Sequence, residues 1–198
     1  MAANRHGPAA SRSSGSEVSV PIHLETPNLG HAAMFLEAVH RSRWFHRGLV
    51  SPPRDRRLYR AYLERFRRPS HEGYFVCLPD GELAGVVNVS EIVRGIFQSA
   101  YLGFYALAPH EGRGHMSAGL GLVLAGAFTK SRLHRLEANI QPTNLRSIAL
   151  VKRLGFRLEG LSRRYLRISG RWRDHERWAI TREDWRGARR GQLLSGTP

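Results

Sequence analysis

The spacing of hydrophobic and polar residues along the chain predicts a domain that combines strands with helices. Over residues 18–25 apolar residues occupy every second position, which is the period of a half-buried strand. Over residues 30–45 they recur at intervals of three and four, as on one face of an amphipathic helix. A proline pair then separates this helix from a second one, which we expect over residues 54–67.

The rest of the chain consists of short apolar segments bounded by residues that are typical of turns. The expected strands cover residues 73–78, 83–93, 97–107, 135–141, 156–168 and 171–181. Helical spacing occurs over residues 116–128 and 144–154. Antiparallel strands therefore come first, and a strand-helix-strand-helix-strand order follows. This order predicts an α/β (α+β) fold, with a mixed, mostly antiparallel central sheet and helices on both faces.

Length and composition indicate the number of domains and the cellular compartment. A chain of 198 residues with 41% hydrophobic content can build one core, and two large domains are not expected. The single cysteine, Cys77, excludes an intramolecular disulfide, and no apolar run is long enough to span a membrane, so we expect a cytoplasmic protein. Residues 1–17 lack the apolar core of a secretory signal. We expect a disordered tail there, a catalytic domain over residues 18–186 and a basic, flexible tail over residues 187–198.

Charge changes the picture further, because 31 Lys and Arg residues against 16 Asp and Glu give a net charge of +15. Nearly all of the cations are arginines, with only Lys130 and Lys152 as lysines. Such a charge attracts polyanions, among them a phosphate-bearing cofactor, an acidic substrate protein or RNA. It does not choose among them. A general preference for arginine on solvated surfaces is an equally good explanation.

A glycine-punctuated loop, residues 109–114, joins a predicted strand to a predicted helix. Backbone N–H groups of such a loop and of the following helix N-terminus can bind phosphate together, and glycine lets the backbone come close. A Gly-x-Gly turn before a helix is also common as a plain connection. The loop becomes informative only together with the segments around it.

Five segments together resemble the GNAT superfamily of acetyltransferases in sequence, order and spacing. They are YLGFY at 101–105, EGRGHM at 111–116, HRLEAN at 134–139, NLRS at 144–147 and LGFRLEG at 154–160. The later segment GRWRDH at 170–175 narrows the resemblance to RimJ/RimL-type ribosomal-protein N-acetyltransferases. The match covers residues 18–186, and the loop departs from the usual family pattern at Glu111 and Met116.

The resemblance implies a sheet that is splayed between the strands over residues 97–107 and 135–141, with acetyl-CoA as cosubstrate. The pantetheine arm would lie in the gap and bond to strand backbone, while the pyrophosphate would rest on the glycine loop. The residues that the resemblance assigns to cofactor binding are Tyr105, Ala106, Leu107, Ala108, Gly112, Arg113, Gly114, His115, Met116 and Asn144.

Acetyl transfer to an amine requires removal of a proton from the amine and a proton donor for the leaving thiolate. Glu137, on the strand beside the expected gap, could accept the first proton through water; pairing with an arginine is the alternative. Asn139 shares a strand face with Glu137 and could orient the amine or a water. Ser147 lies one turn after Asn144 and could protonate the sulfur, or it could be an ordinary helix-start residue.

These residues predict an acetyl-CoA-dependent N-acetyltransferase whose acceptor is a protein N-terminal α-amine, such as that of a ribosomal protein. Two alternatives remain open: an enzyme for a small amine (antibiotic, polyamine or amino acid) and a non-catalytic, basic RNA- or ribosome-binding protein. The predicted helices between Gly30 and Arg68 would face the acceptor and decide between the first two. The ten histidines show no tight ligand spacing, so we expect no metal. A membrane partner is not expected either.

Overall fold

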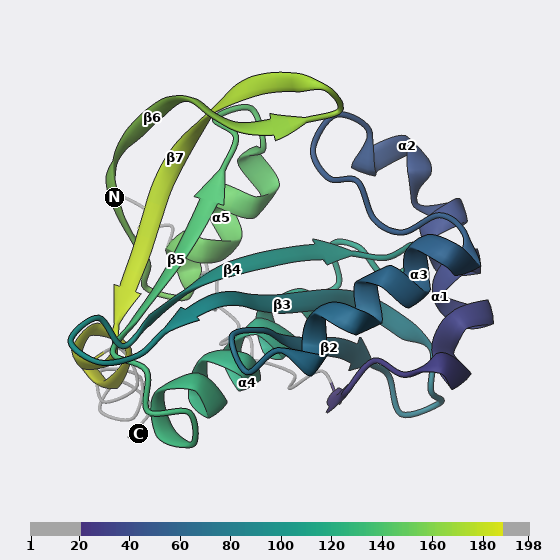
Figure 1. Ribbon diagram of the computed structural model, residues 1–198, viewed down its shortest axis with the longest axis horizontal. Coiled ribbons are helices and arrows are strands. Elements are labelled where there is room, and N and C mark those ends of the chain that lie inside the picture. The colour runs from purple at the N-terminus through teal and green to yellow at the C-terminus, as the bar shows by residue number, and fades with distance from the viewer. Residues whose placement is uncertain (1–20, 188–198) are drawn as a thin grey trace, which may run out of the picture.

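A single sheet of seven strands organises residues 21–187, the part of the chain that the computed structural model describes (Figure 1). The strands are β1 (His23–Glu25), β2 (Glu72–Cys77), β3 (Leu83–Val93), β4 (Ser99–Ala106), β5 (Arg135–Ile140), β6 (Arg157–Ile168) and β7 (Arg171–Thr181). They follow the order β1-β2-β3-β4-β5-β7-β6 across the sheet, and only β4 and β5 run parallel. This confirms the mixed, mostly antiparallel sheet.

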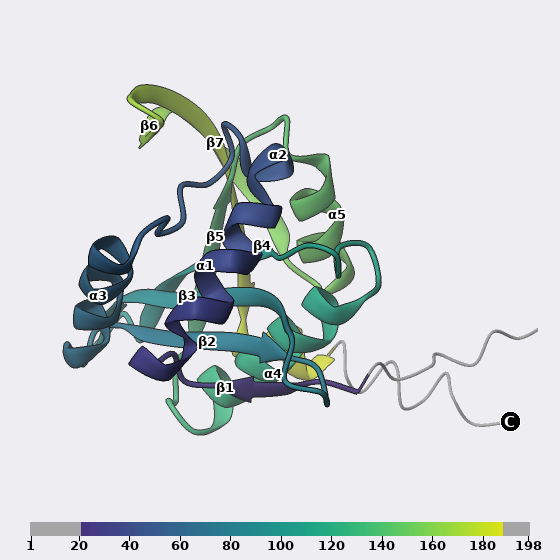
Figure 2. The same ribbon diagram turned by 90° about the vertical axis from the view of Figure 1, so that its right-hand side faces the viewer.

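Helices cover both faces of the sheet, as Figure 2 shows. The helices are α1 (Ala32–Arg41), α2 (Arg43–His46), α3 (Arg56–Glu64), α4 (His115–Thr129) and α5 (Leu145–Arg153), with short 3-10 helices at Leu29–His31 and Arg65–Arg67. The first three lie on one face, and α4 and α5 lie on the other. Among the helices of residues 21–187, none is long and apolar enough to cross a bilayer. The predicted terminal tails, residues 1–17 and 187–198, lie outside these residues apart from Gly187.

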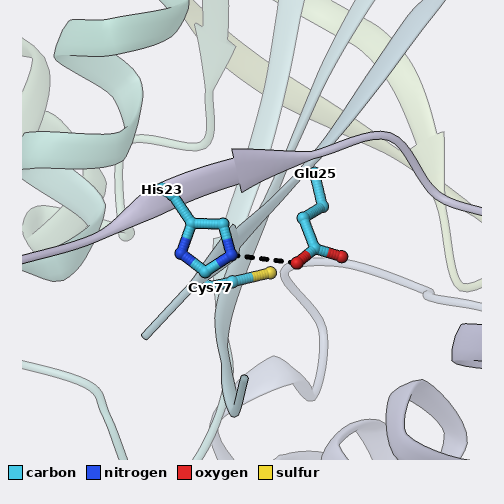
Figure 3. Close-up of side chains that lie close together, drawn as sticks. All are labelled: His23, Glu25 and Cys77. Atoms are coloured by element: carbon cyan, nitrogen blue, oxygen red, sulfur yellow. Dashed lines mark hydrogen bonds and ion pairs between the residues drawn. The ribbon is translucent and has the colours of Figure 1, made fainter. Parts of the chain in front are cut away.

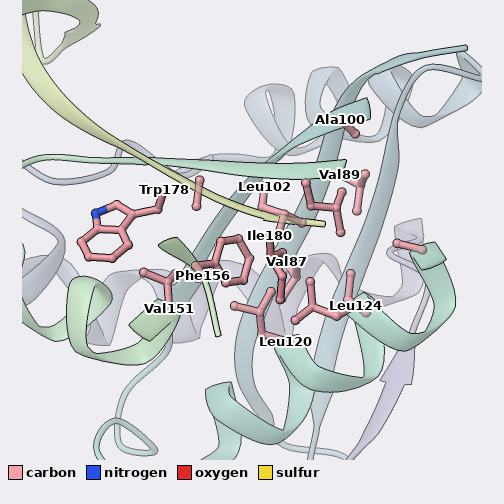
Figure 4. Packing of buried hydrophobic residues seen from close by; sticks show 14 of the residues in the cluster. Val87, Val89, Ala100, Leu102, Leu120, Leu124, Val151, Phe156, Trp178 and Ile180 are labelled. Atoms are coloured by element: carbon pink, nitrogen blue, oxygen red, sulfur yellow. The ribbon is translucent and has the colours of Figure 1, made fainter. Parts of the chain in front are cut away.

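Each face of the sheet has its own hydrophobic core. On the face of α1 and α3, Phe35 stacks on Phe75 with ring centroids 5.4 Å apart and packs against Tyr59 at 4.9 Å. On the opposite face the buried side chains of α4 and α5 meet those of the central strands (Figure 4). Leu120 and Val151, one from each helix, are fully buried there. The sheet is thus packed between two cores, one on each face.

The expected single helix over residues 30–45 was wrong, because the helix is divided at Ser42. This residue is fully buried, and its hydroxyl donates to the Ala38 carbonyl oxygen at 2.6 Å. The Ser42 hydroxyl oxygen in turn accepts the backbone N–H of Ala108 at 2.9 Å. A serine that bonds back to its own helix favours a bend, and here the bond to Ala108 adds a contact with the strand end. The first predicted strand also starts later than expected, at His23, with residues 18–20 outside the described range.

Candidate active site

The parallel strands β4 and β5 pair over only part of their length. Ser99–Leu102 lies opposite Arg135–Ala138. Beyond these residues β4 continues along β3 as far as Ala106, whereas β5 continues along β7 as far as Ile140. The two strands therefore separate after four residue pairs, and their facing edges are unpaired from there on (Figure 1). This is the splayed sheet that the resemblance implied.

The unpaired edge of β4 presents backbone hydrogen-bonding groups to the gap. Leu107 donates its N–H to the Ala84 carbonyl oxygen of β3 at 2.8 Å. In an antiparallel pair, successive residues direct their backbone groups to opposite sides, so those of Ala106 and Ala108 are directed toward the gap. Of the four residues expected to bind the pantetheine arm, these two direct backbone groups away from β3, whereas Tyr105 and Leu107 are engaged with β3.

Two buried side chains from the helix break reach this same edge. His46 Nε2 lies 2.8 Å from the Ala106 carbonyl oxygen, and Ser42 accepts the N–H of Ala108. Burial lowers the pKa of His46, so its ring is neutral near pH 7 and donates through Nε2. The sequence analysis missed both residues, because neither belongs to the family motif. A pantetheine arm that docks here must share or replace these two bonds.

The glycine loop leads into the uncapped N-terminus of α4. Gly114 is the N-cap residue with φ of 84°, and Gly112 has φ of 77°, both in the left-handed region that glycine tolerates best. No side chain caps α4, and its first turn carries no acidic residue. By contrast, the carboxylate of Asp55 caps α3 by accepting the N–H of Leu58 at 2.8 Å. The first N–H groups of α4 are thus free to bind an anion, as a pyrophosphate requires.

The side chains of this loop differ in their exposure. His115 is buried, and its pKa is lowered by burial, by His110 and by Arg113. Met116 fills the space above Gly85, where an added Cβ would collide with its Sδ atom. His115 and Met116 can therefore offer only backbone N–H groups to a cofactor, whereas Arg113 is exposed and can offer its guanidinium.

The next helix, α5, begins directly after the separated end of β5. Asn144 is its N-cap, and its side-chain oxygen accepts the N–H of Ser147 at 3.3 Å. The side-chain nitrogen Nδ2 of Asn144 has no hydrogen bond within residues 21–187 and can donate to a ligand. Ser147 is half-buried in the first turn. The structure thus brings both residues to the wide end of the gap, on the face of α4 and α5.

Glu137 and Asn139 lie on the opposite face of β5, because the intervening residues pack toward α4 and α5. Glu137 pairs with Tyr101 in the unsplayed part, and its Oε1 lies 2.8 Å from Arg135 Nε. Arg135 also forms an ion pair with Glu159. Asn139 lies beyond the separation point, and its side-chain oxygen is buried with no hydrogen-bond partner in the described residues. The structure therefore brings Asn139, but not Glu137, to the gap.

A cavity of about 1130 Å³ lies on the face of α1, across the wide end of the gap. One of its lining residues, His46, bonds to the end of β4. Another, Gly48, accepts a hydrogen bond through its carbonyl oxygen from Gln141 Nε2 just after β5, at 2.9 Å. Ser169, at the tip of the β6–β7 hairpin, forms part of the far wall. Through His46 and Gly48 the cavity lies next to the ends of both separated strands, on the face opposite α4 and α5, with no residue of β4 or β5 in its lining.

A second cluster of polar side chains, His23, Glu25 and Cys77, lies at the sheet edge between β1 and β2 (Figure 3). Their ligand-type atoms lie within 4.8 Å of one another. His23 and Glu25 already form an ion pair at 2.9 Å, and His23 lowers the pKa of Glu25. Burial raises the pKa of the Cys77 thiol to about 11, so it is protonated at neutral pH. Internal pairing accounts for this cluster, and the absence of a metal requirement stays a prediction.

With this geometry established, comparison with known proteins identifies the class. Residues 22–157 match the family model described as "Acetyltransferase (GNAT) domain". The chain belongs to this family, and it is therefore an N-acetyltransferase that uses acetyl-CoA. The separated strands and the uncapped start of α4 fit that cosubstrate.

Similarity to individual proteins narrows the type of acetyltransferase. The chain is 37% identical over 125 residues to the probable N-acetyltransferase YjcK of Bacillus subtilis, covering 62% of this chain and 68% of that protein. It is 41% identical over 104 residues to the ribosomal protein uS5-alanine N-acetyltransferase of Escherichia coli, covering 52% of this chain and 54% of that one. The chain thus spans about half the length of the latter relative. These matches identify the protein as a RimJ/RimL-type enzyme.

Solved structures agree with this fold. Mycobacterium smegmatis RimJ in complex with CoA-disulfide superposes with a TM-score of 0.75 at 26% identity, covering 85% of this chain and 90% of that one. The spermidine N-acetyltransferase of Vibrio cholerae in complex with CoA and spermine gives a TM-score of 0.70 at 21% identity, covering 83% of this chain and 97% of that one. At this identity the second likeness shows the shared fold alone.

Proposed function

We propose that this enzyme acetylates the N-terminal α-amine of a protein, such as a ribosomal protein. The observation that carries the proposal is the cavity at the wide end of the gap. At about 1130 Å³ it exceeds the roughly 300–1,000 Å³ typical of small-molecule sites, so it has room for the first residues of a peptide. The relative that acts on the alanine of ribosomal protein uS5 supports the same acceptor class.

In this proposal the cosubstrate binds from the face of α4 and α5. Backbone groups of Ala106 and Ala108 bind the pantetheine arm in the gap. The N–H groups from Gly112 to Met116, together with the Arg113 guanidinium, bind the pyrophosphate. The free amide nitrogen of Asn144 donates a further hydrogen bond. Backbone donors dominate this half, so their positions depend on the fold more than on particular side chains.

The acceptor amine enters from the cavity and attacks the thioester carbonyl carbon. A carbon–nitrogen bond forms, the carbon–sulfur bond breaks, the amine loses one proton and the departing thiolate gains one. Asn139 orients the amine through its unpartnered side-chain oxygen. Ser147 donates the proton that converts the thiolate to the thiol of CoA. Because Glu137 lies outside the gap and is paired with Arg135, the amine proton passes first to water in the gap rather than directly to this carboxylate.

A small amine is the alternative acceptor, and the likeness to the spermidine enzyme supports it only at the level of the fold. A protein acceptor also accords with a cytoplasmic location and with possible contact between the basic surface and the ribosome or RNA. The unpaired, buried Cys77 is consistent with a reducing compartment. We retain one catalytic domain over residues 18–186 as part of this proposal.

The test is an acceptor panel assayed by the release of free CoA thiol. It contains N-terminal peptides beginning with alanine or serine, the same peptides with a blocked N-terminus, spermidine and free amino acids. We expect acetylation of the free peptides alone, at the α-amine, as mass spectrometry would locate it. Turnover of spermidine with none of the peptides would contradict the proposal. N-terminal mass spectrometry of cells with and without the protein would then identify the natural acceptor.

A further inference from the structure

The acceptor cavity carries an unbalanced positive charge. Four of its lining residues are arginines, and the lining includes no aspartate or glutamate. The arginines are Arg41, Arg43, Arg47 and Arg54. All four are exposed, so their guanidinium groups are open to a ligand. A cavity with this lining presents a positive potential to whatever enters it.

The carboxylates nearest in sequence neutralise only Arg41 among these four arginines. Glu37 forms an ion pair with Arg41 at 2.6 Å, and the Asp55 side chain caps α3 through the N–H of Leu58. Arg47 and Arg54 have no ion-pair partner within residues 21–187. At least two guanidinium groups are therefore available for a ligand that carries carboxylates.

The positions of these arginines connect them to the reaction. Arg43 and Arg47 flank His46, the residue that bonds to the end of β4 at the gap. On the far wall Ser169 stands in the hairpin tip between Arg167 and Arg171, both of which are exposed. A chain that leads its terminal amine from this cavity toward the gap therefore passes Arg43 and Arg47.

We propose that this cavity selects acceptor N-termini that carry carboxylates within the first few residues, and that it rejects polycations. The inference rests on the proposed function and names its substrate class. Guanidinium groups bind carboxylates with two parallel, charge-assisted hydrogen bonds, whereas an ammonium-rich acceptor meets only like charge. Exposed Trp44, another lining residue, offers apolar surface for the side chains between the carboxylates. RNA would meet the same charge, but its bases offer no aliphatic amine to the thioester, so the peptide is favoured.

The experiment compares three peptides of equal length that begin with alanine and differ at positions two to four. These positions carry aspartate and glutamate, asparagine and glutamine, or lysine. At saturating acetyl-CoA we expect kcat/KM to be about tenfold higher for the acidic than for the neutral peptide, as two exposed ion pairs would produce. The lysine peptide should be the poorest. Because these pairs are screened by ions, the acidic preference should shrink as the salt concentration rises from 0.05 to about 0.5 M.

Charge-reversal variants localise the preference. Arg47→Glu and Arg54→Glu together should invert the order, so that the lysine peptide becomes better than the acidic one. The matched control is Arg132→Glu, an exposed arginine in the connection before β5, at the paired end of the strands. It should leave the acidic preference intact. A thermal shift with acetyl-CoA, retained in all variants, shows that each one is folded.

The outcomes separate this inference from the function on which it rests. If all three peptides are acetylated equally, the inference is wrong and the proposed function stands. If spermidine is acetylated and no peptide is, the proposed function itself fails. An RNA oligonucleotide is added as a competitor: its failure to inhibit while the acidic preference holds supports the peptide. Strong inhibition by RNA with no acidic preference would assign the arginines to nucleic acid and overturn the inference.

Discussion

The two faces of the gap between β4 and β5 are built from different parts of the polypeptide. On the proposed cofactor face the candidate binding groups belong mostly to the backbone, at Ala106, at Ala108 and at the start of α4. On the acceptor face the lining consists of side chains from α1, α2, the following connection and a hairpin tip. Because the fold sets the positions of backbone groups, the cofactor face can stay constant while side-chain changes alter the charge of the acceptor face. One fold can thus keep one cosubstrate and serve different acceptors.

The cofactor face and the acceptor face meet at the break between α1 and α2. Ser42 and His46 belong to the acceptor face, yet both bond to backbone groups on the edge of β4. A cofactor that competes for these groups would displace the side chains and alter the cavity wall. The comparison therefore predicts that changes on the cofactor face act on rate or cofactor affinity, whereas changes on the acceptor face act on acceptor choice.

The largest expected effect is on kcat and comes from Ser147, the proposed proton donor on the cofactor face. Ser147→Ala should lower kcat by about 10²–10⁴-fold, the usual value of general acid catalysis, with acetyl-CoA binding nearly unchanged. Stopped assays of CoA release and calorimetry of acetyl-CoA binding would measure both. A variant that keeps more than about half of the wild-type kcat would assign proton donation to water.

Loss of cofactor binding is the next effect in size. Acetyl-CoA at a hundredfold excess over its Kd should stabilise the protein by about 2.7 kcal/mol. Gly114→Val should abolish this thermal shift, because a β-branched residue at φ of 84° distorts the loop and its side chain obstructs the phosphates. Gly121→Ala, in the same helix with no atom within 4 Å of the added Cβ, is the control and should retain the shift. Equal thermal shifts with acetyl-CoA in both variants would contradict the proposed phosphate site.

A smaller effect separates two roles of Asn144. Asn144→Ala should cost about 1 kcal/mol of folding stability through loss of the α5 cap, and it should also raise KM for acetyl-CoA. Asn144→Asp keeps a capping oxygen but lacks the amide donor, so it should fold as stably as the wild type and still raise KM. Chemical denaturation and steady-state kinetics would measure the two quantities. An unchanged KM in both variants would leave Asn144 with a capping role alone.

Local features of the fold could be predicted from the sequence, and those set by distant contacts could not. The predicted strands over residues 156–168 and 171–181 leave two residues, Ser169 and Gly170, for the turn between them, and both have positive φ, 49° and 80°, as in a tight hairpin turn. The helix over residues 30–45 was mispredicted because its break depends on Ala108, 66 residues away. No local pattern contains that contact.

The same distinction holds within the site. The glycine loop is contiguous in sequence, so its place before α4 could be predicted from a motif. Whether Glu137 or Asn139 faces the gap depends on where β4 leaves β5, and strand periodicity alone does not specify that point. The arginine-lined cavity also escaped the sequence analysis, because the overall charge of +15 gave no sign of which arginines lie together.

The smallest expected effect is a pH dependence of stability that originates at the junction of the two halves. Burial lowers the pKa of His46 in the folded protein from its ordinary value of 6.5, so the unfolded chain takes up a proton more readily. Stability from this group is therefore fully present above pH 6.5 and is lost as the pH falls through the lower, folded-state pKa. His115 and His175, whose pKa values burial also lowers, act in the same direction.

His46→Gln tests this origin, because a glutamine amide can still donate to the Ala106 carbonyl oxygen but does not titrate. In the wild type, Tm should fall between pH 7.5 and pH 5.5, and the fall should be smaller in His46→Gln. For a chain of this size about 1 kcal/mol corresponds to roughly 2–4 °C, so calorimetry resolves such a difference. The exposed His40, changed to glutamine, is the matched control and should leave the fall unchanged. An identical fall in all three proteins would show that protonation of His46 is not the source of this pH dependence.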